Sequence, residues 1–216
     1  MKGLILSFLM ISTFANINIV SQHESVSTSV IITEPTKKDQ GYNEDYKTIF
    51  NNMKKAMNTA PNTDNYNLNF VLEMTPHHEG GINMAKAIVK YGSNPEVKKI
   101  AENIITSQEA QIPIMKELAS KFEKEKPSDK QNNKNYINEY NKVKETMFNQ
   151  MESVTITNDA DVNFLQQMIY HHEGAIAMAI NILKYTKDPE LKKLAENIVS
   201  SQSKGVKEMR ALLKKL

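Results

Sequence analysis

The stretch Met74-Thr-Pro-His-His-Glu-Gly-Gly-Ile-Asn-Met-Ala85 recurs 94 residues later as Met168-Ile-Tyr-His-His-Glu-Gly-Ala-Ile-Ala-Met-Ala179. The same offset relates most of positions 42–118 to a similar residue further along, for example Pro95 to Pro189. No gap interrupts this register. The chain is therefore built from two copies of one unit, each centred on a His-His-Glu-Gly motif.

Methionine and histidine are the side chains that the two copies share most consistently. Ten of the 12 Met and four of the five His pair at this offset. The pairs are Met53 with Met147, Met57 with Met151, Met74 with Met168, Met84 with Met178, Met115 with Met209, His77 with His171, and His78 with His172. This pairing indicates a function that uses symmetrically placed His and Met.

Composition excludes several classes of protein. The 27 Lys and Arg and the 25 Asp and Glu are interspersed, so no basic stripe predicts nucleic-acid binding. Cysteine is absent, which excludes disulfides, thiolate zinc sites and thiol nucleophiles. A soft-metal site in this chain would have to use Met.

The N-terminus resembles a targeting segment. Lys2 precedes the apolar run Leu4–Phe14, and Ala15 ends an acceptable cleavage site. We expect a signal peptide over 1–15 and an exported protein, periplasmic or extracellular. The run is short for a membrane span, which needs about 20 residues. We therefore expect no stable span after its removal, an uncleaved anchor being the alternative.

The rest of the chain divides into a leader and helices. Residues 16–40, which include His23, are rich in Ser, Thr and Val without a helical period and are predicted to be a flexible leader. From position 41 onward the apolar residues follow a helical period. The expected helices cover about 42–57, 64–91 and 94–118 in repeat one, and 136–151, 159–185 and 188–212 in repeat two. The two repeats, 41–125 and 130–216, are expected to form one helical bundle over 41–216.

Two local signals locate the helices and their crossings. Asn94-Pro95-Glu96 and its equivalent at 188–190 combine a capping side chain, Pro in the first turn and an acidic residue, which is typical of a helix start. Gly80, Gly81 and Gly174 fall inside helices, where each costs about 1 kcal/mol relative to Ala. The glycines therefore predict a close approach of a neighbouring helix or ligand beside the His.

The motif at 168–179, followed by Asp-Pro-Glu-Leu and a helix ending in Glu-Met-Arg, resembles the bacterial family catalogued as domain of unknown function 305. The resemblance covers the chain after the leader. It implies an all-α, ferritin-like helical bundle built here from two tandem three-helix repeats. It also implies an exported protein of largely unassigned activity, with some members associated with copper or silver.

The side chains around the motif form a borderline-to-soft ligand set. On a helix turning about 100° per residue, His77 and Met84 lie about 20° apart, and His78 lies about 40° from Met74. Imidazole with thioether favours Cu(I) or Ag(I), with Cu(II) or Zn(II) as alternatives at the imidazoles. The candidate ligands are His77, His78, His171, His172, Met74, Met84, Met168 and Met178. One shared site and two equivalent sites are both compatible with the repeat.

A bundle without metal is the main alternative. Met fills irregular gaps in cores, and Met53, Met57, Met147 and Met151 are interpreted in that way. Gln108 and Gln202 lie on apolar stripes and are candidate hydrogen-bond partners for the imidazoles. In this alternative the motif serves helix crossing and recognition of a protein partner.

A di-iron oxidoreductase is the less favoured alternative. Such sites use Glu-x-x-His pairs, whereas Glu73 precedes His77 by four residues and is replaced by Gln167 in the second copy. Glu102 and Glu196 recur in both copies and are weak ligand candidates, with exposure beside the apolar stripe as the alternative. Glu79 and Glu173 would either orient an imidazole of another helix or face solvent.

Two prolines distinguish the first copy from the second. Pro76 and Pro113 fall within predicted helices, where Pro bends or ends the helix, so Thr75 is an alternative helix start. We predict a protein that binds copper or another soft metal for sequestration or resistance and is not an enzyme. Its partners would be the metal ion and either a second copy in a homodimer or a metal-transfer protein.

Overall fold

The computed structural model describes residues 34–216, which are helical and contain no strand. The six helices are α1 (Lys37–Thr59), α2 (Tyr66–Tyr91), α3 (Pro95–Phe122), α4 (Lys130–Glu152), α5 (Ala160–Leu183) and α6 (Pro189–Leu213). The all-α prediction and its six helices are confirmed. The predicted signal peptide at 1–15, His23 and most of the predicted leader lie outside the described residues.

The helix starts follow the capping chemistry in the sequence. The side chains of Asn94 and Asp188 accept hydrogen bonds from the first backbone amides of α3 and α6, with Pro in the first turn of each helix. Thr36 and Asp39 form a capping box for α1, which therefore begins before the predicted leader boundary at 40. Local side-chain acceptors decide these boundaries.

Both prolines are accommodated inside continuous helices. Asn65 caps α2, which runs from Tyr66 through Pro76 to Tyr91, and α3 includes Pro113. The alternative start at Thr75 is therefore wrong. Burial of the flanking turns outweighs the single backbone hydrogen bond that each Pro removes.

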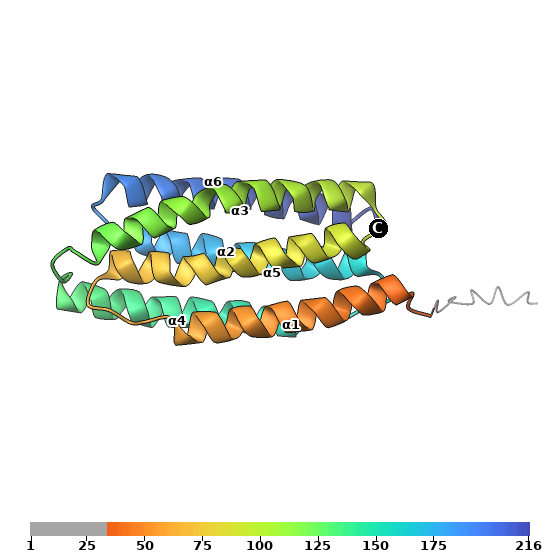
Figure 1. Ribbon diagram of the computed structural model, residues 1–216, viewed down its shortest axis with the longest axis horizontal. Helices are drawn as coiled ribbons and strands as arrows, with labels where there is room; N and C mark the ends of the chain where they lie inside the picture. Colours follow the sequence, from red (N-terminus) through yellow and green to blue (C-terminus); the bar gives the residue numbers. More distant parts are fainter. Residues whose placement is uncertain (1–33) are drawn as a thin grey trace, which may run out of the picture. The chain divides into compact units, whose positions relative to one another are not determined.

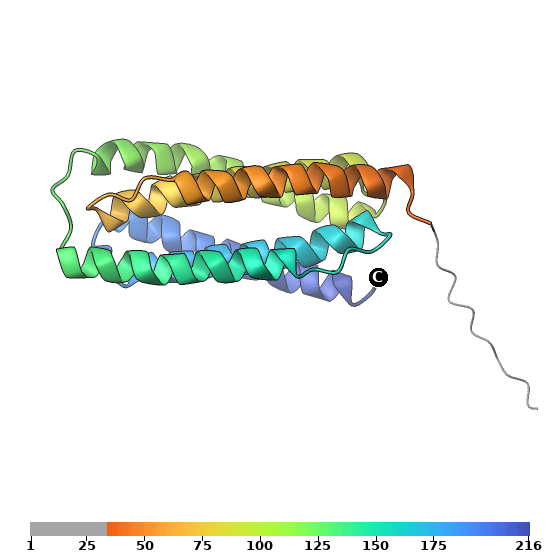
Figure 2. The same ribbon diagram turned by 90° about the horizontal axis from the view of Figure 1, so that it is seen from below.

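The helices of residues 34–216 form three layers of two (Figures 1 and 2). The central layer is α2 with α5; α1 and α4 lie on one side of it, and α3 and α6 lie side by side on the other. Each layer pairs equivalent helices of the two repeats. The His motifs at mid-helix in α2 and α5 are thereby brought to the centre of the bundle.

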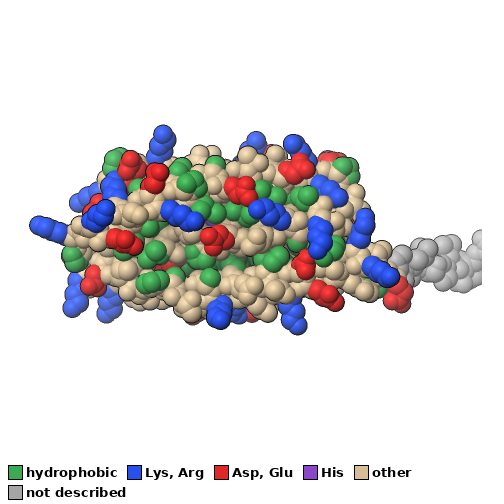
Figure 3. Space-filling view, viewed as in Figure 1, with side chains coloured by type: hydrophobic (Ala, Val, Ile, Leu, Met, Phe, Trp, Pro, Cys, Tyr) green, Lys and Arg blue, Asp and Glu red, His purple; other side chains and the backbone are tan. Residues whose placement is uncertain are grey.

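The two repeats exchange buried hydrogen bonds. The hydroxyl of Tyr42 on α1 donates to Gln167 on α5 at 2.8 Å, and that of Tyr136 on α4 donates to Glu73 on α2 at 3.1 Å. On the surface, charges of both signs are interspersed (Figure 3). Among residues 34–216, no helix is both long and apolar enough to cross a membrane.

Candidate metal centre

The four paired histidines meet in one buried cluster. The rings of His77 and His171 are stacked, with their centroids 3.8 Å apart. His78 and His172 flank this pair, at 6.0 and 5.8 Å from the neighbouring ring on their own helix. All four side chains are buried. The two motifs therefore contribute to one constellation at the crossing of α2 and α5.

The central pair is held by reciprocal hydrogen bonds. The Nε2 of His77 donates to the backbone carbonyl of His171 at 3.2 Å, and the Nε2 of His171 donates to the carbonyl of His77 at 3.0 Å. Because a carbonyl only accepts, the ring proton of each imidazole is assigned to Nε2. Each Nδ1 is then an unprotonated nitrogen, and neither has a hydrogen-bond partner.

The cluster is electrically neutral at physiological pH. Burial lowers the pKa of His78 to about 4 and that of His171 to about 3. Burial also holds the pKa of His77 and of His172 well below the usual value, and the neighbouring imidazoles lower it further. Neutral imidazoles bind a metal ion without first losing a proton.

His78 is held by a residue that the sequence interpretation missed. Its Nε2 donates to Oε1 of Gln111 at 2.7 Å, and Nε2 of Gln111 donates to Asn197 on α6 at 2.8 Å. The amides of the predicted partners, Gln108 and Gln202, make no hydrogen bond at all. That prediction was wrong; Gln111 departs from the repeat, since Gly205 is its equivalent, and this difference was the available signal.

The four candidate Met ligands are buried on the same helices as the imidazoles. Met74 lies one turn before His78, and Met168 lies one turn before His172, on the same helix face. Met84 and Met178 lie further along α2 and α5. Thioethers therefore flank the imidazole cluster in both repeats.

The motif glycines make room for side chains from neighbouring helices. A Cβ at Gly80 would overlap the thioether of Met53, and one at Gly174 would overlap that of Met147. A Cβ at Gly81 would lie 2.6 Å from Cε1 of His171. The glycines do mark close contacts, but what approaches them is a Met, His or Gln side chain of another helix and not a neighbouring backbone.

The acidic residues of the two motifs do not join the cluster, and the buried carboxyl of Glu73 on α2 contacts Tyr136. Glu79, Glu102 and Glu196 are exposed, and Glu173 pairs with Arg210. Within residues 34–216, no three His, Asp or Glu side chains are grouped so as to hold a metal ion. Any binding at the cluster therefore has to combine imidazole with thioether.

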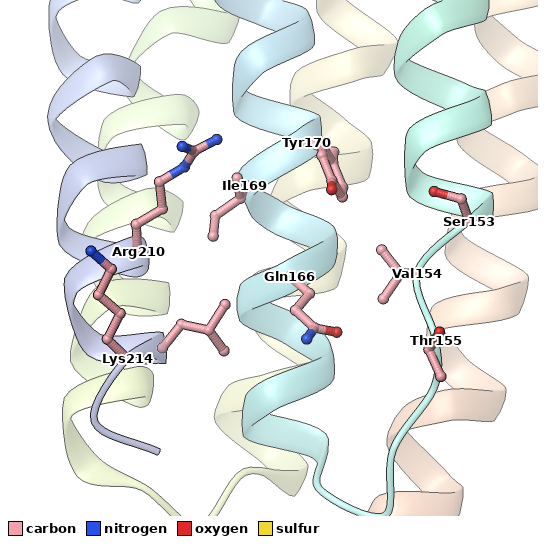
Figure 4. Close-up of a pocket in the computed structure, with 9 residues that line it drawn as sticks. Ser153, Val154, Thr155, Gln166, Ile169, Tyr170, Arg210 and Lys214 are labelled. Atoms are coloured by element: carbon pink, nitrogen blue, oxygen red, sulfur yellow. The ribbon is translucent and has the colours of Figure 1, made fainter.

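A separate surface pocket of about 560 Å³ lies beside α5 in the second repeat (Figure 4). Tyr170 and Gln166 on α5 face the loop after α4, and the other wall is formed by Arg210 on α6 and by Lys214, which directly follows that helix. The four clustered histidines are absent from its lining. It is a surface feature distinct from the imidazole cluster.

Comparison with known proteins decides the family. The profile described as "Domain of unknown function (DUF305)" matches residues 67–213. The chain belongs to the DUF305 family. A solved DUF305 fragment from Deinococcus radiodurans shares the fold, with 24% identity, a TM-score of 0.52, and coverage of 70% of this chain and 97% of that one.

Other DUF305-like structures were solved with metals. This chain is 31% identical to CopM in the Ag-bound form, with a TM-score of 0.53 over 71% of this chain and 96% of that chain. The Cu(I)-bound form of CopM gives 31% identity and a TM-score of 0.52 over the same shares. "Uncharacterized protein L153" of Acanthamoeba polyphaga mimivirus is 43% identical over 53 residues, which is 24% of this DUF305 chain and 35% of that protein. The match thus spans about a third of that curated relative.

Proposed function

We propose that this protein binds a soft metal ion, Cu(I) or Ag(I), at the His cluster between α2 and α5, and that it serves sequestration or resistance outside the cytoplasm. The observation that carries the proposal is the set of buried, neutral imidazoles whose Nδ1 atoms have no partner. Buried polar atoms are nearly always hydrogen-bonded in folded proteins. The unpartnered Nδ1 atoms of His77, His78 and His171, gathered in one cluster, therefore support a bound ligand.

The donor set fits a soft monovalent ion. Imidazole nitrogen and thioether sulfur are the available donors, since Cys is absent and no carboxylate is grouped with the imidazoles among the described residues. Two of the imidazoles of His77, His78, His171 and His172 would hold the ion, together with the thioether of Met74 or Met168, which lies one turn away on the same helices. Cu(I) and Ag(I) accept low coordination numbers and soft ligands. The metal-bound CopM structures support this choice of ion.

Localisation rests on the sequence. Residues 1–15 have the charged start, apolar run and small-residue site of a secretory signal. An exported copper-binding protein would act in the periplasm or outside the cell, and would pass its ion to a metal-transfer partner or hold it in a homodimer.

The test measures metal affinity. The protein without its signal peptide is kept under reducing conditions and titrated with Cu(I), Ag(I), Zn(II) and Fe(II), and two double-alanine variants are titrated in the same way. We expect tight Cu(I) or Ag(I) binding. Because all four rings share one cluster, His77→Ala/His78→Ala and His171→Ala/His172→Ala should weaken binding to a similar degree. Loss in only one of the two variants would contradict a shared centre.

A structural bundle is the second candidate. The reciprocal His77 and His171 hydrogen bonds favour it, because they join the two central helices without any ion. Absence of binding by every ion, together with loss of thermal stability in both paired variants, would establish this role instead. Fe(II) uptake with oxidation would favour a di-iron enzyme.

A further inference from the structure

A second pocket lies between α3 and α6, where the two repeats face each other. It has a volume of about 310 Å³. Equivalent residues of both repeats line it: Ser107 and Ser201, Gln108 and Gln202, Gln111 and Gly205. The four clustered imidazoles all belong to the described part of the chain, and His172 is the only one of them that borders this pocket. The pocket therefore takes three pairs of equivalent residues from the two repeats, but it reaches an imidazole of the second repeat alone.

The asymmetry arises from one pair of equivalent positions. In the first repeat, Gln111 covers His78 and is itself held by Asn197. In the second repeat, Gly205 occupies that position and has no side chain to cover His172. A Cβ at Gly205 would lie 3.3 Å from Nε2 of His172 and 3.1 Å from its Cδ2. The glycine leaves the imidazole edge open to the pocket.

Unpartnered polar groups mark the inner wall of this pocket. Gln108 and Gln202 are only 2% and 3% exposed, yet both amide atoms of each lack a hydrogen-bond partner. Two amides buried in this way are unusual, because an unmade hydrogen bond costs about 1–3 kcal/mol. Together with His172 they form a polar lining suited to a bound ion and its water.

The other three imidazoles have no comparable opening. The Nε2 atoms of His77 and His171 are occupied by backbone carbonyls, and that of His78 is occupied by Gln111. Among the described residues, His172 is the imidazole of the cluster that borders this pocket, with its Nε2 beside Gly205.

We propose that the metal ion reaches the cluster through the α3–α6 pocket, that Nε2 of His172 is the first ring nitrogen it meets, and that Gln111 closes the equivalent path to His78. This inference rests on the proposed function and adds the route of exchange. Uptake is thus one-sided in a nearly symmetric molecule. The sequence difference between Gln111 and Gly205 determines the side.

The first test uses the metal-free protein and diethyl pyrocarbonate, which modifies accessible neutral imidazoles, with the sites located by mass spectrometry. His172 should react about tenfold faster than His78, because reaction at a covered ring requires local opening. Gly205→Gln should slow the modification of His172 to the rate seen at His78. Gln111→Gly should make His78 reactive. Equal rates at the two rings in the unaltered protein would overturn the one-sided route.

The second test follows uptake of Ag(I), a redox-inert probe, by stopped-flow fluorescence. Gly205→Gln should slow association about tenfold, because the covered path opens only by rearrangement. Ser203→Gln, which places the same side chain on α6 away from the pocket lining, should leave the rate unchanged. Circular dichroism verifies that each variant is folded. Gln111→Gly, which opens the path to His78, should accelerate uptake, and it tests the route independently if Gly205→Gln fails to fold.

The outcomes separate the two proposals. Unchanged association rates in both Gly205→Gln and Gln111→Gly, with Ag(I) still bound, would overturn the route alone. Absence of Ag(I) and Cu(I) binding by the unaltered protein would overturn the metal function and with it the route. A slower rate in Gly205→Gln with normal uptake in Ser203→Gln supports the inference.

Discussion

At the scale of single residues, Glu73 and Gln167 show how equivalent positions differ in chemistry. Both side chains are buried and accept a hydrogen bond from a tyrosine of the other repeat. Burial raises the pKa of the Glu73 carboxyl to about 8, and the hydrogen bond from Tyr136 only partly offsets that effect. Glu73 is therefore protonated at neutral pH and resembles the Gln that replaces it.

This protonation makes stability depend on pH in a defined direction. The folded state binds the Glu73 proton more tightly than the unfolded state, where the carboxyl pKa is near 4.5. The contribution of this bound proton to the free energy of unfolding is thus complete below about pH 4.5, and it is lost as pH rises through about 8. Glu73→Gln should remove this loss. The free energy of unfolding of the variant, relative to that of the unaltered protein, should therefore rise by about 2–4 kcal/mol from pH 5 to pH 9.

Urea unfolding at pH 5, 7 and 9 measures this difference. The matched control is Gln167→Glu, which should introduce the same pH dependence in the second repeat because Tyr42 offers the same hydroxyl. If the free energy of unfolding changes with pH in the same way in the unaltered protein and in Glu73→Gln, the buried-carboxyl explanation is refuted.

At the scale of helices, Gly80 and Gly174 determine how the outer layer of α1 and α4 rests on α2 and α5. Each glycine receives the thioether of a Met from the outer helix, Met53 and Met147 respectively. Both Met side chains are buried. The interpretation of these two Met as core residues agrees with this position, and the helix propensity lost at glycine is compensated by that contact.

Overfilling this contact should be destabilising. Gly174→Leu forces the side chain against Met147, and we expect a loss of about 2–3 kcal/mol in the free energy of unfolding. Adding Met147→Ala to the same chain should recover part of the loss, because the two positions touch and their effects are coupled. Strictly additive effects in urea unfolding would show that the clash lies elsewhere.

At the scale of the whole bundle, the repeats depend on each other. Besides the two tyrosine hydrogen bonds, the carboxylate of Asp161 accepts from the amides of Ser93 and Asn94 at 2.9 Å each. Asp39 accepts from the amide of Ala160 at 3.0 Å. The helix ends of each repeat are therefore completed by side chains from outside that repeat.

This interdependence predicts cooperative unfolding. Residues 34–216 should unfold in one transition, with far-ultraviolet circular dichroism and tyrosine fluorescence coinciding. Fragments 41–125 and 130–216 expressed separately should lack stable tertiary structure, because each would expose the inner face of α2 or α5. Two resolved transitions, or a folded isolated repeat, would contradict a shared core.

Much of the helical organisation was readable from the sequence because it depends on local rules. Apolar periodicity predicted the six helices, and capping residues such as Asn94 and Asp188 located their starts. The start of α1 was missed although it is local, because the capping box of Thr36 and Asp39 precedes the apolar period that located the other helices. Pro76 misled because the surrounding burial of α2 outweighs a local preference.

The sequence by itself determined the repeat, the all-helical class and the candidate side chains, since periodicity, capping and residue chemistry are encoded within a few turns of chain. Only the tertiary structure decided that the four imidazoles form one cluster, that Gln111 and not Gln108 contacts His78, and that Gly205 opens a pocket at His172. These facts depend on which helix faces meet across about 94 residues of chain, and long-range contacts leave no periodic signature in a single sequence.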